Sequence, residues 1–159
     1  MYIDAENQFS DSQALSGAAA TVGTNVIDLG VAQSVGNGEP LAVMFTVIVA
    51  ADQADGDEDY TFDVEYATNA AQSTGAQLMG RRIFESGTPA APAQDADLLV
   101  VGFKFFIPIP ATTDPEDGQF LGIRYTLAGT TPSITMDAVV MPMSMVDATV
   151  DYTSGFTIT

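Results

Sequence analysis

The sequence predicts an all-β fold, a sandwich of short antiparallel strands. Runs rich in Val, Ile, Phe and Tyr recur along the chain, and clusters of Gly, Pro, Asn and Asp separate them about every 10–15 residues. Residues 60–66 alternate strictly between apolar and polar side chains, which is the period of a half-buried strand. No segment predicts a convincing helix. The pattern favours seven to nine strands in a β-sandwich or jelly roll, and it does not by itself separate a jelly roll from an immunoglobulin-like sandwich. The paired Cys and Trp of immunoglobulin domains are absent.

The elements follow one another without an internal repeat. The expected strands cover residues 25–29, 41–51, 60–66, 81–84, 98–109, 120–127, 134–141 and 148–152. Residues 41–51 are almost all apolar and rich in β-branched side chains, so they predict a central strand covered on both faces. Within residues 98–109, Gly102 is a candidate bulge.

The first 20 residues differ from the rest, because they are polar at first and then small. They predict an extended N-terminal arm over residues 1–20, followed by one β domain over residues 21–159. The alternative is a first strand around Tyr2 followed by a loop. A chain of 159 residues with 47% hydrophobic residues is long and apolar enough to bury one core.

The composition argues against enzyme chemistry, and we expect no cofactor. Cys and His are absent, which excludes disulfides, thiol nucleophiles and the usual general base. A glycosidase would need two carboxyl groups with perturbed pKa values. The acids here lie in turns or, like Asp63 and Glu65, on the expected solvent face of a strand, where desolvation is weak. Lys104, the only lysine, is expected to point to solvent or to an interface rather than to act as an activated amine.

The charge is strongly negative, at −17, and is unevenly spread. Residues 1–80 hold 12 of the 21 acids and no Lys or Arg. Binding to nucleic acid or to an anionic membrane surface is not expected, because both need clusters of cations. The longest apolar stretch, residues 41–51, is far shorter than the about 20 residues of a spanning helix. The N-terminus lacks the pattern of a cleavable signal.

The sharpest candidate metal site is the acidic loop, with carboxylates at Asp52, Asp55, Asp57, Glu58 and Asp59. Carboxylates around a glycine turn are ligands that calcium prefers. The spacing does not fit an EF-hand, however, and a solvated hairpin loop is the simpler explanation of the composition. Two hypotheses therefore remain for this loop.

Three of the four cations are candidates of a different kind. Arg81, Arg82 and Arg124 stand in an acidic chain, so they either pair with its own acids or lie at a subunit interface, where Arg is enriched. In the N-terminal segment, Tyr2, Ile3 and Phe9 are candidates for a contact with a partner or a sister subunit.

Four segments resemble one family. They are Asp4-Ala5-Glu6-Asn7-Gln8-Phe9-Ser10-Asp11-Ser12-Gln13-Ala14, Thr24-Asn25-Val26-Ile27-Asp28-Leu29-Gly30, Gly38-Glu39-Pro40-Leu41 and Phe120-Leu121-Gly122-Ile123-Arg124-Tyr125. In this order they resemble the capsid cement (decoration) proteins of podophages typified by a Bordetella phage. The resemblance spans about residues 1–140, and residues 141–159 do not match.

The resemblance implies a jelly roll of about eight antiparallel strands that binds the outer surface of an icosahedral phage head. It implies homo-oligomers, dimers or trimers, that bridge major capsid protein subunits with the HK97-type fold. The alternative function is a virion-surface module, a calcium-dependent carbohydrate-binding jelly roll. Neither function involves nucleic acid, a membrane or catalysis.

Overall fold

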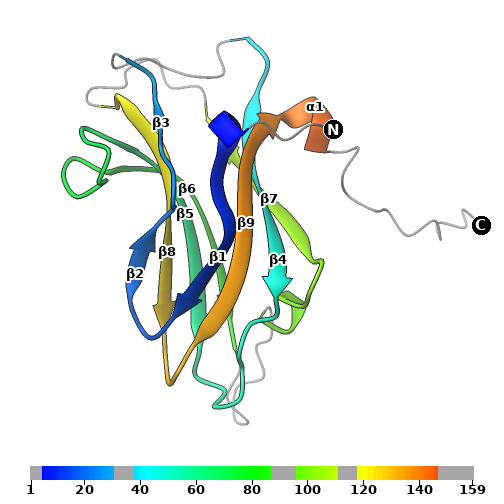
Figure 1. Ribbon diagram of the computed structural model, residues 1–159. Helices are drawn as coiled ribbons and strands as arrows, with labels where there is room; N and C mark the ends of the chain where they lie inside the picture. The colour runs from blue at the N-terminus through cyan, green and yellow to red at the C-terminus, as the bar shows by residue number, and fades with distance from the viewer. Residues whose placement is uncertain (1–4, 31–37, 87–95, 111–117, 147–159) are drawn as a thin grey trace, which may run out of the picture.

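The computed structural model describes residues 5–30, 38–86, 96–110 and 118–146, which form two antiparallel sheets packed face to face (Figure 1). The first sheet has the order β1-β9-β4-β7, with β1 at Gln8–Ser16, β9 at Ser133–Pro142, β4 at Leu41–Val49 and β7 at Lys104–Ile109. In the second sheet, β2 at Ala20–Val22 and β3 at Ile27–Asp28 both pair with β8 at Phe120–Ala128, and β5 at Asp59–Ala67 and β6 at Gln77–Glu85 follow. The short helical elements are η1 at Ala5–Asn7, η2 at Ala96–Leu98 and α1 at Met143–Val146.

The strand pairing is that of a jelly roll. If β2 and β3 count as one interrupted strand, the described residues form eight strands, and these pair in a nested order: first with last, second with seventh, third with sixth, fourth with fifth. Such nesting is a long hairpin rolled onto itself, and it distributes the strands alternately over two sheets. The jelly-roll prediction is therefore confirmed, and the immunoglobulin-like alternative is not.

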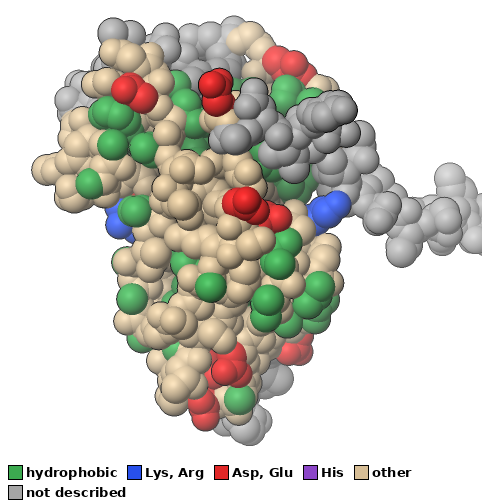
Figure 2. All heavy atoms as spheres, in the orientation of Figure 1, with side chains coloured by type: hydrophobic (Ala, Val, Ile, Leu, Met, Phe, Trp, Pro, Cys, Tyr) green, Lys and Arg blue, Asp and Glu red, His purple; other side chains and the backbone are tan. Residues whose placement is uncertain are grey.

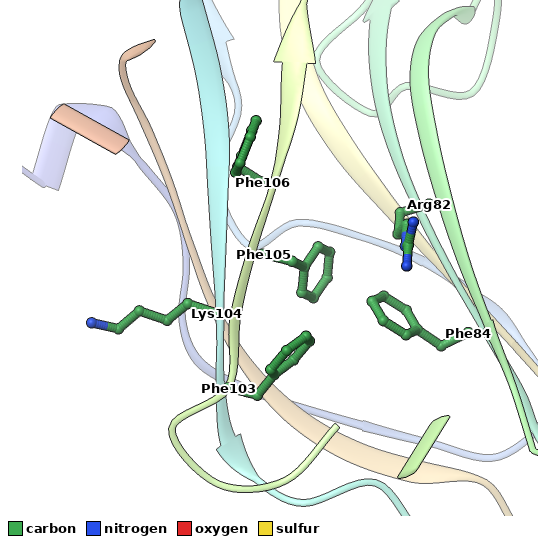
Figure 3. Close-up of a pocket in the computed structure, with 6 residues that line it drawn as sticks. All are labelled: Arg82, Phe84, Phe103, Lys104, Phe105 and Phe106. Carbon is green, nitrogen blue, oxygen red and sulfur yellow. The ribbon is translucent and has the colours of Figure 1, made fainter. Parts of the chain in front are cut away.

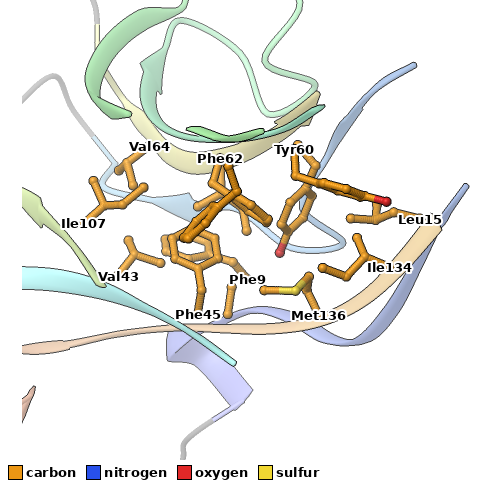
Figure 4. Close-up of a cluster of buried hydrophobic side chains, with 14 of the residues drawn as sticks. Phe9, Leu15, Val43, Phe45, Tyr60, Phe62, Val64, Ile107, Ile134 and Met136 are labelled. Atoms are coloured by element: carbon orange, nitrogen blue, oxygen red, sulfur yellow. The ribbon is translucent and has the colours of Figure 1, made fainter. Parts of the chain in front are cut away.

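The core lies between the sheets and combines aliphatic side chains with a cluster of aromatic rings (Figure 4). The apolar face predicted for residues 60–66 is confirmed, because Tyr60, Phe62, Val64 and Tyr66 are all buried. The ring of Phe62 lies edge-on to Phe45 at 5.6 Å between centroids. Burial of such side chains stabilises the sandwich by roughly 1.5–3 kcal/mol each.

Strand β4 is covered on both faces, as predicted for residues 41–51. Val43 and Phe45 point into the sandwich core. Ala42 and Met44, on the opposite face, pack in a second buried cluster with Met141 and with Val146 of α1. This short helix thus covers the outside of the first sheet.

The predicted N-terminal arm is wrong for the residues that the structure describes. Residues 8–16 form β1, which pairs with β9, and Phe9 and Leu15 are part of the core. The pattern was obscured because β1 changes register twice along β9 and holds Ser12 at a positive φ of 48°. These irregularities break the alternation that identifies a strand.

Other boundaries also differ. The strand expected over residues 98–109 begins only at Lys104, because Gly102 takes a turn conformation with φ of 86° instead of forming a bulge. The strand at residues 81–84 extends to Gln77–Glu85, and that at residues 25–29 shrinks to Ile27–Asp28. The strand expected at residues 148–152 lies outside the described residues.

Candidate interaction surface

The two sides of the sandwich, where the edges of its sheets meet, are built differently. On one side, β1 is tied to the segment between β2 and β3. The Gln13 side chain donates to the Val22 carbonyl at 2.9 Å and accepts from the Thr24 amide at 3.1 Å, and the Asn25 amide donates to the Phe9 carbonyl at 2.9 Å. We call this the closed side.

The opposite side lies between β6 and β7, and we call it the open side. Near Gly80 the sheets approach so closely that an added Cβ would lie 2.5 Å from the Ile107 side chain. Further along, the strands separate and leave a pocket of about 240 Å³ (Figure 3). The pocket is lined by Arg82, Phe84, Phe103, Lys104, Phe105 and Phe106.

The pocket has an aromatic floor with one cation, Arg82, over it. The Phe84 ring centroid lies 4.9 Å from that of Phe105 and 6.1 Å from that of Phe103. The Arg82 guanidinium lies over Phe84, 5.0 Å from the ring centroid, a distance that permits a cation–π interaction. Lys104 points away from the rings, on the other side of β7 (Figure 3). The arrangement can bind apolar side chains and anionic groups together.

Arg81 is held on the outer face of the second sheet by Asp63, to which it donates two hydrogen bonds, at 2.6 and 2.7 Å. These hydrogen bonds and the charge of Asp63 raise the pKa of Arg81 above its ordinary value. Arg124 donates to the Glu65 carboxylate at 3.0 Å and also to the Gln72 carbonyl at 2.5 Å.

The expectation that Asp63 and Glu65 face solvent is therefore wrong. Their exposures are only 2% and 7%, because the arginines cover them from the neighbouring strands. The intramolecular pairing considered for the arginines is present at Arg81 and Arg124, and their role at an interface stays a prediction.

The acidic loop does not assemble a metal site. Asp57 accepts hydrogen bonds from the amide and hydroxyl of Thr130, both at 3.0 Å, and Asp52 accepts one from the Ala54 amide at 3.1 Å. Asp59 lies in β5. Among the described residues, no three Asp or Glu side chains are grouped to hold a metal ion. The loop uses its carboxylates to fasten itself to the turn between β8 and β9.

Glu58, one of the carboxylates of the candidate loop, organises this loop from a buried position. Its carboxylate accepts hydrogen bonds from the amides of Asp55 and Asp57, at 3.0 and 3.1 Å, and from the Ser86 hydroxyl at 2.9 Å. Burial raises the pKa of Glu58, but the hydrogen bonds from Asp55, Ser86 and Gly56 outweigh it, so the pKa lies below its ordinary value. This geometry is typical of a structural carboxylate rather than a catalytic acid.

The predicted contact residues have separate positions. The prediction that Phe9 contacts a partner is wrong, because Phe9 is fully buried in the core. Tyr2 and Ile3 lie outside the described residues. Arg82 lies on the open side, as shown above, and Arg81 precedes it on the same strand.

Sequence reasoning missed the aromatic pocket. The phenylalanines within residues 103–106 indicated a strand but not that this strand would lie at a sheet edge. On the face shown in Figure 2, acids form separate patches, and Lys and Arg are visible only at two flanks. No helix within the described ranges is long and apolar enough to cross a membrane.

Fold and surface together define a jelly-roll protein with one closed side and one open side that holds an aromatic pocket. The chain belongs to the Bbp16 family, whose model matches residues 9–140. This match confirms the resemblance to the Bordetella phage family. It makes the chain a phage structural protein and a component of the virion, and it indicates a protein that is not an enzyme. No curated protein matches the chain.

Proposed function

We propose that this protein is a capsid cement protein, which binds the outer surface of an icosahedral phage head and stabilises it by bridging major capsid subunits. The observation that carries the proposal is the family match over residues 9–140. The major capsid protein is the proposed partner, with an HK97-type fold, and the protein acts as a homo-oligomer, a dimer or trimer.

The charge supports an outer rather than an inner position. A net charge of −17 opposes contact with packaged DNA, which is a polyanion. The cations of the described residues also do not form a patch for a phosphate backbone, since Arg81 and Arg124 are paired with Asp63 and Glu65.

The physical basis of cementing is mass action combined with avidity. A protein that binds the assembled shell and not the free subunits shifts the equilibrium toward the shell. Repeated contacts on a symmetric surface multiply the effect of each weak contact. The function thus needs only complementary surfaces, and it needs no reactive group.

The test is to mix the purified protein with shells that lack it and to image the shells by electron microscopy. Density at regular positions on the outer surface, together with a higher temperature of shell disruption, is the expected result. Shells that remain bare, or density on the inner surface, would overturn the proposal.

A second experiment tests the N-terminal contact. Since residues 8–16 belong to the sandwich, the informative deletion removes only residues 1–4, with Tyr2 and Ile3, and leaves β1 intact. We expect this deletion to weaken shell binding or self-association while the melting temperature stays the same. If neither changes, these residues make no contact.

A further inference from the structure

The four sheet edges differ in how well they are protected from pairing with another chain. Edge strands present unpaired backbone groups, and proteins usually block them with Pro, Lys, bulges or short length. Strands β2 and β3 have only three and two residues, and β1 has two irregularities in register. Strand β7 carries Lys104 and Pro108. Three of the edges are thus blocked.

Strand β6 is the exception over residues 80–85, because its one register shift against β5 lies between Leu78 and Gly80. Residues Gly80–Glu85 pair with β5 in continuous register, and no other described strand pairs with β6. The strand has no Pro, and it exposes two large apolar side chains, Ile83 at 41% and Leu78 at 47%. A regular, exposed, partly apolar edge of this kind is suited to accept an added strand.

The charge on this side selects the partner. Two of the four cations of an otherwise acidic chain, Arg81 and Arg82, lie on β6. Arg82 reaches the pocket, whereas Arg81 is paired with Asp63 on the outer face and Lys104 points away from the rings. Complementary charge favours a segment that is itself acidic, and it favours approach at this side over the rest of the surface.

The pocket beside β6 provides room for side chains of the added strand. Arg82 and Phe84 project from β6 toward the rings of β7 (Figure 3). In a strand laid along β6, alternate side chains point to the same face. One set can therefore reach the aromatic floor and the Arg82 guanidinium.

A second copy of the chain is a poorer occupant. Full-length antiparallel pairing of β6 with its own copy would bring the arginines at positions 81 and 82 of both chains together. Like charges on facing strands are destabilising. Each copy also carries a net charge of −17, which adds a general repulsion.

We propose that the free edge of β6 over residues 80–85 accepts an extended acidic strand from a capsid subunit by β-strand addition, with the β6–β7 pocket taking its apolar side chains. This inference rests on the proposed function for the source of the strand. It goes beyond that function by identifying the surface and the chemistry of the contact.

The test uses the full chain and a capped synthetic peptide that repeats Asp-Asp-Val-Val, so that each face of the extended peptide carries both Asp and Val. We expect saturable binding by fluorescence anisotropy, and slower hydrogen exchange of backbone amides within residues 77–85. The same peptide with Lys in place of Asp should bind at least about ten-fold more weakly. Equal binding of the two peptides, no binding of the Asp peptide, or protection elsewhere would overturn the proposal.

Two variants with the same change in charge locate the contact. Arg82→Glu should weaken binding of the Asp peptide about ten-fold or more, whereas Lys104→Glu on the blocked edge should have a clearly smaller effect. Thermal melting of both variants verifies that they fold. Equal effects would mean that net charge alone governs binding, which contradicts a site on β6.

The same variants separate this inference from the proposed function. If wild type and Arg82→Glu decorate empty shells equally well, cementing stands and the contact at β6 is wrong. If the peptide binds at β6 but shells remain bare, the acidic-strand site stands and its assignment to a capsid subunit fails together with the cement function.

Discussion

The closed and open sides of the sandwich join the edges of the two sheets in different ways. On the closed side, Gln13 and Asn25 use their hydrogen-bonding groups to join β1 to the β2–β3 segment. On the open side, β6 and β7 meet closely at Gly80, and beyond it aromatic rings and cations line a pocket. Polar groups that are satisfied internally give stability, whereas an apolar edge flanked by cations can give binding. The difference suggests that one side maintains the fold and the other serves a partner.

The largest expected effect compares two phenylalanines. Phe9 is fully buried at the closed side, whereas Phe106 is 39% exposed beside the open side. Phe9→Ala should lower the free energy of unfolding by about 3–5 kcal/mol, because it leaves a cavity in the core. Phe106→Ala should cost no more than about 1 kcal/mol. Urea denaturation measures both, and similar losses would mean that the two sides do not differ in their contribution to stability.

A second comparison uses the glycines at which the sheets approach. An added Cβ at Gly23 would lie 2.7 Å from the Ile123 side chain, and one at Gly80 would lie 2.5 Å from Ile107. Each Gly→Ala change should destabilise by about 1–3 kcal/mol through overpacking. Only Gly80→Ala should also alter the open side. We therefore expect Gly80→Ala to bind the acidic peptide more weakly than wild type, whereas Gly23→Ala should bind it as wild type does.

A smaller effect concerns one polar group on each side. The Tyr125 hydroxyl donates to Ser10 at 2.9 Å inside the core, so Tyr125→Phe should cost about 1 kcal/mol. Arg82→Gln removes the cation over Phe84 and should cost about 0.5 kcal/mol. Chemical denaturation at neutral pH distinguishes the two. A greater loss for Arg82→Gln would show that Arg82 has a structural role.

The smallest expected effect is a change in how stability depends on acidic pH. It concerns the end of the open side, where Glu58 accepts a hydrogen bond from Ser86. Because the pKa of Glu58 in the folded protein lies below its ordinary value of 4.5, the folded state binds this proton less readily than the unfolded state. The stabilisation is present above pH 4.5 and is lost as the pH falls through the folded pKa. Glu58→Gln should therefore lose less stability than wild type between pH 6 and about pH 3. An unchanged acid dependence would mean that other carboxylates dominate it.

Much of the fold could be predicted from the sequence because its periodicity is local. The alternation at residues 60–66 depends only on neighbouring residues, and the structure confirms it. Strand β1 could not be recognised, because its irregular register hides the alternation and its partner β9 lies more than 100 residues away. The positive φ at Gly102 likewise converts an apparently continuous strand into a turn and a shorter strand.

The candidate surface was less predictable, because it depends on which strands become neighbours. The polarity of Asp63 and Glu65 indicated exposure, but Arg81 and Arg124 on the adjacent strands cover them. The pocket requires β6 and β7 to end their respective sheets on the same side, and this follows from the topology alone. Single-residue properties cannot reveal such juxtapositions.

The nested pairing of the jelly roll has a consequence for how the chain acquires its structure. During synthesis, β1 emerges first but pairs with β9, whose first residue follows more than 110 residues later. At about 5–20 residues per second, the first strand waits at least several seconds for its partner. Contacts so distant along the chain also make folding slow. We therefore expect β1 to dock last, so that a nascent chain exposes the Phe9 side of its core until the final strand of the sheet is complete.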